Sequence, residues 1–346
     1  MTQRNQLVTF VVFAYNQERF IAEAVRGALS QTYSPLEILF SDDCSTDRTF
    51  EIIQQEVSNY RGQHKIIINR NARNLGFGTH INRVMEIVNG QLIVAAAGDD
   101  VSLPERVAKL YTVYESAKGK TLALFSNAIV IDESGNQDSL YLIPPDPKAL
   151  SLDWMAKRGG GALGCAQAWD RKVFELFGQI DEAVIHEDLV IPFRAALVGK
   201  VEFLSQPLVL YRRHTGNIHF KEVNQVKGAG QLQMALLKHT NSLIAVYNTR
   251  LRDIDTAQRL FPERRQALLG VHQHTLKGSQ EVRNHQALLL SDDPFKRLAI
   301  IAKAIIRGTR FRVVVRWILT FFFPQLYLYY QERLRNKTRR QSRMRD

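Results

Sequence analysis

The first 130 residues alternate between short apolar runs and longer stretches with the spacing of amphipathic helices. Short runs rich in Val, Ile and Phe between polar turns are typical of buried parallel strands. These runs are residues 7–13, 37–41, 65–68 and 92–96. The helical patterns are residues 18–31, 46–60, 78–88 and 104–116. This order predicts an α/β fold in which right-handed crossovers wind a mostly parallel, Rossmann-like sheet.

In such a sheet the ligand binds at the carboxyl ends of the strands, so the residues directly after each run should carry the chemistry. Polar and acidic segments occur at residues 14–18, 42–47 and 98–100. Carboxylates gathered at one edge repel one another unless a cation lies between them. A divalent metal, held by few carboxylates and by phosphate oxygens, resolves this repulsion and points to nucleotide chemistry. No GxGxxG motif follows the first run, which disfavours a dinucleotide-binding domain.

Further along, strands are predicted at residues 122–131, 201–204 and 208–211, and from about residue 220 the pattern is helical. An acidic pair, Glu187 and Asp188, precedes a short apolar helix. We therefore predict two parts, a catalytic domain over residues 1–217 and a helical C-terminal region over residues 218–346.

The composition is that of an ordinary globular protein, with 45% hydrophobic and 23% charged residues. It excludes a polytopic membrane protein and a disordered chain. Two cysteines, Cys44 and Cys165, are too few for a disulfide framework or a cysteine-based metal site, and they indicate reduced thiols in the cytosol. The first residues have no secretory signal pattern.

The net charge of +12 lies entirely in the C-terminal segment. Residues 296–346 contain 14 Lys or Arg and two acids, whereas residues 1–295 contain 32 of each sign. A neutral body disfavours a nucleic-acid groove, and a basic tail favours an anionic surface. The aromatic stretch 317–330 is interrupted by Pro324 and is too short to span a bilayer. We expect it to lie in the membrane interface, which places the protein at the inner face of the cell membrane. The alternative is a core helix with a solvated basic tail.

Several motifs follow one another in order along residues 7–217. They are 13–21, Gln31-Thr32-Tyr33, 41–47, Asn74-Leu75-Gly76, Gly98-Asp99-Asp100 with Pro104, His186-Glu187-Asp188 and Tyr211-Arg212-Arg213-His214. In this order they resemble the motifs of family 2 glycosyltransferases of the GT-A fold. The resemblance implies a nucleotide-sugar transferase with a mostly parallel sheet.

For the donor nucleotide, the resemblance implies that Asp43 accepts a hydrogen bond from a nucleobase imide, which fits uracil or thymine. It implies that Tyr15 lines the base. The other residues that it assigns to the donor are Ala14, Asn16, Glu18, Asn74, Gly76, Asp99 and Arg212. Arg212 could instead pair with nearby acids. The family usually has Gly where this chain has Cys44.

For the metal, Asp99 resembles the last carboxylate of the family's DXD element, in which Ala97 replaces the first acid. The resemblance implies that Mn or Mg is held by Asp99, Asp100 and His214. Asp100 could instead cap the helix that follows, and a single His is more often structural than a ligand.

For catalysis, Asp188 resembles the catalytic base of the inverting members, with Glu187 as an acceptor-side or orienting group. Without the motif context, the pair could simply be acids favoured at a helix N-terminus.

The sequence thus predicts an inverting transferase that moves a sugar from a UDP-sugar or dTDP-sugar to a hydroxyl of a glycan or lipid-linked acceptor, in bacterial surface polysaccharide synthesis. One alternative is a nucleotidyltransferase that acts on a sugar phosphate. The other is a non-catalytic membrane-associated scaffold, which would not need Asp43, Asp99 and Asp188 together.

Overall fold

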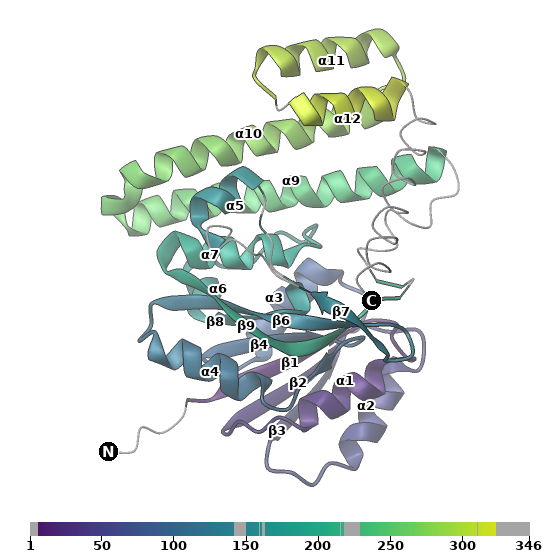
Figure 1. Ribbon diagram of the computed structural model, residues 1–346, viewed down its shortest axis with the longest axis vertical. Coiled ribbons are helices and arrows are strands. Elements are labelled where there is room, and N and C mark those ends of the chain that lie inside the picture. The colour runs from purple at the N-terminus through teal and green to yellow at the C-terminus, as the bar shows by residue number, and fades with distance from the viewer. Residues whose placement is uncertain are drawn as a thin grey trace. The chain divides into compact units, whose positions relative to one another are not determined.

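The computed structural model describes residues 6–141, 150–158, 160, 163–214, 216–217, 229–309 and 311–322 (Figure 1). The chain forms two compact units, Met1–Asn217 with Ala245–Leu276, and Ile218–Ile244 with Lys277–Asp346. The first unit extends past the predicted boundary at residue 217, because it includes residues 245–276. The assignment of a function to each of the two predicted parts stays a prediction.

The strands of the described residues are β1 Val8–Ala14, β2 Leu36–Asp42, β3 Lys65–Arg70, β4 Leu92–Ala97, β5 Val101–Ser102, β6 Thr121–Ile131, β7 Gln137–Tyr141, β8 Gln167–Asp170 and β9 Lys200–Arg212. They form one sheet in the order β3-β2-β1-β4-β8-β6-β9-β5, with β7 paired to β6. The four predicted N-terminal strands are confirmed and run parallel. β8 is antiparallel to both of its neighbours, so the sheet is mixed beyond β4. The two closing strands of the prediction are one continuous strand, β9.

The helices of the first unit lie between and after these strands. They are α1 Ile21–Leu29, α2 Thr49–Ser58, α3 Phe77–Ile87, α4 Arg106–Ser116, α5 Leu152–Arg158, α6 Lys172–Phe177 and α7 Ile191–Val198, with the 3-10 helices η2 Gly164–Ala166 and η3 Glu187–Leu189. The C-terminal helices are α9 Ala229–Leu260, η4 Pro262–Arg264, α10 Arg265–Leu290, α11 Pro294–Ile306 and α12 Phe311–Phe322.

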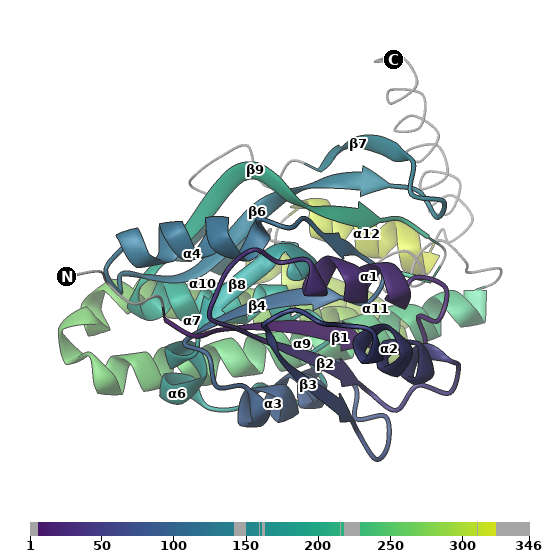
Figure 2. The ribbon, with the colours of Figure 1, turned by 90° about the horizontal axis from the view of Figure 1, so that it is seen from below.

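The sheet is covered by helices on both faces because successive strand residues point to opposite sides. On β1, Phe10 and Val12 pack with α1, α2 and α4, whereas Val11 and Phe13 pack with α3, α6 and α7. All four side chains are buried, and each contributes about 1.5–3 kcal/mol by leaving water. Figure 2 shows α1 and α2 side by side along the parallel strands. This packing fixes the loops that leave β1, β2 and β4.

The parts of α9 and α10 within the first unit complete its core. Buried residues of α9 and α10 join those of α5 and α7 in one apolar cluster. A buried ion pair links the same elements: Arg194 of α7 donates to both carboxylate oxygens of Asp253 of α9, at 2.8 and 3.2 Å. Because α7 follows η3 directly, this pair also holds the segment that carries the predicted catalytic acids.

Candidate active site

The register of the parallel strands brings the predicted donor residues to one edge of the sheet. Ala14, the last residue of β1, lies opposite the last residue of β2, and Phe13 lies opposite the last residue of β4. Neighbouring strands are about 4.8 Å apart, so the segments after β2 and β4 lie about 10 Å apart with β1 between them. Asp43 and Asp99 therefore belong to the same edge.

Asp43 directly follows β2, and its buried carboxylate lies against the backbone just before α3. Its Oδ1 accepts hydrogen bonds from Asn71 Nδ2 at 2.8 Å and from the backbone N of Leu75 at 2.9 Å, and its Oδ2 accepts one from the backbone N of Gly76 at 3.1 Å. A carboxylate is favoured at a helix N-terminus, where backbone N–H groups lack partners. A carboxylate oxygen accepts two hydrogen bonds, so Oδ2 retains capacity for a ligand donor.

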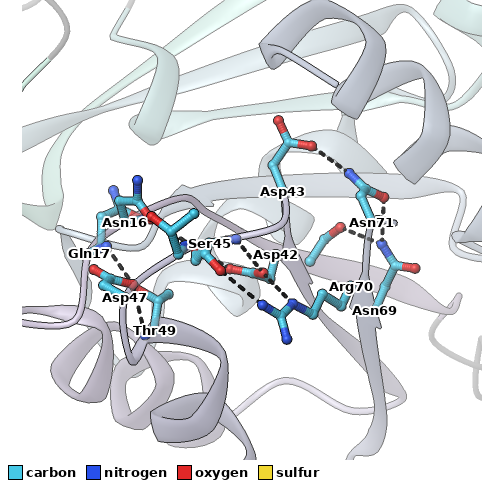
Figure 3. A network of polar contacts seen from close by, with 12 residues as sticks. Asn16, Gln17, Asp42, Asp43, Ser45, Asp47, Thr49, Asn69, Arg70 and Asn71 are labelled. Carbon is cyan, nitrogen blue, oxygen red and sulfur yellow. Dashed lines mark hydrogen bonds and ion pairs between the residues drawn. The ribbon is translucent and has the colours of Figure 1, made fainter. Parts of the chain in front are cut away.

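A chain of hydrogen bonds leads from Asp43 through Asn71 to Asn69 (Figure 3). Asn69 donates to Asn71 Oδ1 at 3.2 Å and to Ser41 Oγ at 3.0 Å, and Ser41 is hydrogen-bonded to His80 Nε2 at 2.7 Å. Burial lowers the pKa of His80, although the charges of nearby acids oppose this effect. The sequence reasoning missed these residues. Their signal was the polar Asn69 and Asn71 at the carboxyl end of the third apolar run.

Asn16 and Glu18 join the loops after β1 and β2. Asn16 Oδ1 accepts from the backbone N of Thr46 at 2.8 Å. Asn16 itself has a φ of +52°. The backbone N of Glu18 donates to Asp47 Oδ2 at 3.1 Å, and Glu18 Oε2 accepts from the backbone N of Arg48 at 3.0 Å. These bonds hold the two loops together; Asn16 and Asp47 are labelled in Figure 3. The contact of Asn16 and Glu18 with a donor stays a prediction.

The other predicted base-site residues lie around Asp43. Tyr15 is an exposed aromatic, with 46% of its surface accessible. The carbonyl of Ala14 accepts from the backbone N of Asp43 at 2.9 Å, and Asn74 Oδ1 accepts from the backbone N of Gly76 at 3.1 Å. Gly76 has a φ of +76°, which L side chains rarely adopt.

Cys44 also has a positive φ, of +60°. Glycine adopts this left-handed conformation without a steric cost, whereas other residues pay for it. The positive φ thus gives a physical reason for the Gly that the family usually has at this position. Cys44 adopts the same conformation at a steric cost.

Asp99 and His214 are in direct contact, with His214 Nε2 and Asp99 Oδ2 2.9 Å apart. The backbone N of Gly216 donates to His214 Nδ1 at 3.0 Å, so the ring proton is on Nε2 and points to Asp99. Asn217 Nδ2 also donates to Asp99 Oδ2, at 3.2 Å. One carboxylate and one imidazole, both suitable metal ligands, therefore face each other.

Asp100 is placed differently from Asp99. Its buried carboxyl accepts from the backbone N of Arg212 at 2.8 Å and is hydrogen-bonded to the Cys165 thiol. Burial, and then the charge of Asp99, raise the pKa of Asp100 well above its usual range. Within the described ranges no group of three or more His, Cys, Asp or Glu could hold a metal. Asp99 and His214 carry donor atoms that suit Mn or Mg, whereas Asp100 is hydrogen-bonded within the protein; metal binding by Asp99, Asp100 and His214 stays a prediction.

Arg212 is buried and its guanidinium binds the protein itself. It donates to Glu23 Oε2 at 2.8 Å, to the carbonyl of Asp99 at 3.1 Å, and to the carbonyls of Asp132 and Glu133 at 3.3 and 3.2 Å. These bonds position the loop that carries Asp99. The assignment of Arg212 to the donor diphosphate stays a prediction.

Glu187 and Asp188 lie in η3 with unequal surroundings. Glu187 is buried and accepts from Gln167 Nε2 at 2.8 Å, whereas Asp188 is half-buried. Burial, followed by the charge of Asp188, raises the pKa of Glu187 well above its usual range. A Cβ added to Gly164 would lie 2.3 Å from Glu187 Oε1, so any larger residue there would displace the Glu187 carboxyl. Buried Glu187 therefore holds its proton to a higher pH than an exposed glutamate does, and Asp188 is the more accessible of the two acids.

The acidic pair lies beside the Asp99 loop because η2 and β8 connect the two. Gln167, the partner of Glu187, is the first residue of β8, which pairs antiparallel with Leu92–Val94 of β4, so Gln167 lies at the end of β8 that is nearer to the carboxyl end of β4. Cys165 of η2 is hydrogen-bonded to Asp100. Through these contacts the Glu187–Asp188 pair lies near Asp99 and Asp100, which follow the carboxyl end of β4.

Arg250 of α9 is a further residue that the sequence reasoning missed. It is buried, and it donates to the carbonyl of Leu189 at 2.8 Å and to that of Met155 at 3.2 Å. Burial lowers its pKa to about 10, against the favourable charge of Asp188 among others. Arg250 therefore remains charged at neutral pH and holds η3. No motif marks it, because it lies in a helix distant in sequence.

Comparison with known proteins identifies the domain. Residues 9–176 match the family Glycosyl transferase family 2. An uncharacterized glycosyltransferase of Nostoc sp. is 25% identical over 252 residues, which cover 70% of this chain and 76% of that protein. Uncharacterized proteins of Mycobacterium bovis and Mycobacterium tuberculosis are 26% identical, and the match covers 60% of their length.

Solved structures share the fold. Residues 1–349 of TarS from S. aureus, in complex with UDP-GlcNAc, align with a TM-score of 0.50 and 15% identity, over 85% of this chain and 83% of that one. The mannosyltransferase PcManGT from Pyrobaculum calidifontis, in complex with GDP-Man and Mn2+, aligns with a TM-score of 0.51 and 15% identity, over 93% and 88%. Residues 9–176 thus match glycosyl transferase family 2, and together with the glycosyltransferase relatives and the shared GT-A fold this match supports a glycosyltransferase.

Proposed function

We propose that the protein transfers a sugar, with inversion, from a UDP-sugar or dTDP-sugar to a hydroxyl of a glycan or lipid-linked acceptor of a bacterial surface polysaccharide. The proposal rests on three acids near the same strand ends, Asp43 and Asp99 within the matched residues 9–176 and Asp188 beyond them. Asp43 and Asp99 follow β2 and β4, and Asp188 is joined to the same side of the sheet through Glu187 and Gln167.

Asp43 would recognise the nucleobase. Its Oδ2 accepts one protein hydrogen bond and has capacity for the imide N–H of uracil or thymine. Cytosine has an acceptor at the same ring position and would be repelled. The exposed ring of Tyr15, which follows β1 directly, is suited to stack on the base.

Asp99 and His214 would hold a divalent metal, Mn or Mg, together with diphosphate oxygens. Their facing ligand atoms, 2.9 Å apart, support this assignment, and the related mannosyltransferase fold is known in complex with Mn2+. When bound, the metal supplies Lewis-acid stabilisation of the charge on the leaving diphosphate. The proton that His214 shares with Asp99 must leave before both atoms become ligands.

Asp188 would act as the general base. The acceptor oxygen forms a bond to the anomeric carbon from the face opposite the diphosphate, whose bond to that carbon breaks with its electron pair. Asp188 takes the hydroxyl proton, which contributes about 100- to 10,000-fold to the rate. Asp188 is half-buried whereas Glu187 is buried with a raised pKa, so Asp188 is the better placed of the two to accept a proton from a substrate hydroxyl.

We place the enzyme at the inner face of the cell membrane, where a lipid-linked acceptor is available. The concentration of positive charge in residues 296–346 supports this placement. Within the helices that the structure describes, none has the length and apolar content to cross a bilayer. Residues 323–346, which belong to the predicted contact segment, lie outside the described residues.

Isothermal titration calorimetry with sugars linked to UDP, dTDP, CDP and GDP tests the proposal, with Mn2+, Mg2+ or a chelator. We expect a UDP- or dTDP-sugar to bind at least about tenfold more tightly than its CDP analogue, because cytosine lacks the imide donor. NMR of the product should show an inverted anomeric configuration. Tightest binding of a CDP-sugar would contradict the role of Asp43. Pyrophosphate release from a nucleoside triphosphate and a sugar phosphate would instead identify a nucleotidyltransferase.

A further inference from the structure

The helices α11 and α12 form a small apolar core within the second unit. Ile301 and Ala304 of α11 are buried against Val314 and Trp317 of α12, together with Leu288 of α10. Trp317 is only 1% exposed. The expectation that the aromatic stretch from residue 317 lies in the membrane interface is therefore wrong for Trp317, because this ring packs inside the protein. Residues 323–330 of that stretch lie outside the described residues.

A second apolar face of α11 is exposed. Phe295 is 81%, Leu298 52%, Ile305 54% and Ile306 84% accessible. At about 100° per residue, these side chains fall within an arc of about 100°, whose centre lies on the side of the helix away from the buried Ala304. Phe311, at the start of α12, is 80% accessible and follows the turn after α11. An apolar stripe thus extends along α11 and past its end.

Positive charge borders this stripe, and the nearest acids in sequence, Asp292 and Asp293, lie at the N-terminal end of α11. Over residues 294–322 the sequence has no Asp or Glu and has seven basic residues, Lys296, Arg297, Lys303, Arg307, Arg310, Arg312 and Arg316. Lys296, Lys303 and Arg307 are exposed. By the same helical spacing they lie within an arc of about 40° along one border of the apolar stripe.

An exposed apolar stripe with a basic border is the pattern of a helix that lies in the interface of an anionic bilayer. Large apolar side chains on a monomer surface normally occur singly, so this cluster requires an explanation. An acidic protein partner would account for the charge, but it would not account for two phenylalanines and two isoleucines that are all more than half exposed.

We propose that the exposed face of α11, with the turn up to Phe311, is the lipid-inserting surface of this protein. Phe295, Leu298, Ile305, Ile306 and Phe311 would enter the acyl boundary, while Lys296, Lys303 and Arg307 contact anionic headgroups. This inference deepens the proposed membrane partner and rests on that part of the proposed function. It replaces the buried aromatic Trp317 with residues that are accessible.

Vesicle sedimentation of the full chain tests this surface, with phosphatidylcholine vesicles that contain or lack phosphatidylglycerol. We expect binding to the anionic vesicles and its reduction by added salt. The variants Ile306→Glu and Phe311→Glu should each lower the partition coefficient about tenfold or more. The matched control is Leu269→Glu in α10, which is 45% exposed and lies in the other unit, and it should bind as the unchanged protein does.

Donor binding and transfer to a soluble acceptor, measured without vesicles, separate this inference from the chemistry. Both should be unchanged in Ile306→Glu, and circular dichroism should report an unchanged fold. Vesicle binding that is equal in Ile306→Glu, Phe311→Glu and the unchanged protein would overturn the inference. So would a lack of binding to anionic vesicles together with a self-association that Ile306→Glu abolishes, because the stripe would then be an interface between copies of this chain.

Discussion

Asp43→Asn separates the structural role of this buried carboxylate from its proposed role in donor binding. The three hydrogen bonds that Asp43 accepts come from Asn71, Leu75 and Gly76. An amide in its place keeps one oxygen, which can retain the two bonds to Oδ1, and turns an N–H group toward the N–H of Gly76. Hydrogen bonds to charged groups contribute about 1.5–3 kcal/mol each, so we expect a loss of about 1–3 kcal/mol in the free energy of unfolding.

The same substitution removes the acceptor for the nucleobase. The loss of one charge-assisted hydrogen bond, about 1.5–3 kcal/mol, raises the Kd for UDP about 10- to 150-fold. At saturating donor, kcat should change much less, because the interaction is also present in the ground state. Titration calorimetry gives the Kd, urea unfolding gives the stability, and initial rates give kcat.

Glu37→Gln is the matched control, because Glu37 is also a buried carboxylate of β2 but lies near its opposite end. Its carboxylate accepts from Thr9 Oγ1 at 3.0 Å, from Lys65 Nζ at 2.7 Å and from Asn89. We expect this variant to lose stability and to bind UDP with unchanged affinity. If Asp43→Asn also binds UDP with unchanged affinity, then Asp43 only supports the α3 loop and the nucleobase assignment is refuted.

Three further substitutions test the support of the site. Asp253→Asn leaves the buried Arg194 without its carboxylate and should lower the free energy of unfolding by about 3–5 kcal/mol in urea. A loss of unfolding free energy no larger than that of a surface substitution would contradict the importance of the Arg194–Asp253 pair. Glu187 has a raised pKa in the folded state, so it stabilises the fold below its ordinary value near 4.5, and this contribution disappears as pH rises through the raised value. Glu187→Gln should therefore flatten the dependence of stability on pH above about 4.5, and an unchanged pH profile would refute the burial effect. His214→Ala should weaken Mn2+ binding in the presence of UDP at least about tenfold, as measured by calorimetry, whereas equal binding would leave Asp99 without its proposed co-ligand.

The parallel half of the sheet was predictable from the sequence because its strands are buried on both faces and stand out as short apolar runs. β8 was not, since its four residues, Gln167–Asp170, mix polar and apolar types and are too short to show a period. The single strand β9 was read as two runs because polar residues near Pro207 interrupt its pattern. These elements depend on contacts with distant residues, which a local pattern does not contain.

The location of the acids was predictable because residues after parallel strands meet at one edge. The direction of each side chain was not. Asp99 and Asp100 are adjacent, yet one faces His214 and the other is buried against the backbone of Arg212. The aromatic neighbours and basic flanks of Trp317 are compatible both with a ring that faces lipid and with a ring in a protein core. The sequence alone therefore does not show that Trp317 is buried.

The central claim is that Asp188 deprotonates the acceptor on a donor held by Asp43 and Asp99. The most direct measurement is the sugar-transfer rate of Asp188→Asn alongside its Kd for the donor. Asp188→Asn should keep a donor Kd within about twofold of that of the unchanged protein, and its transfer rate should be lower by about 100-fold or more. A variant that transfers sugar at the original rate would contradict the central claim.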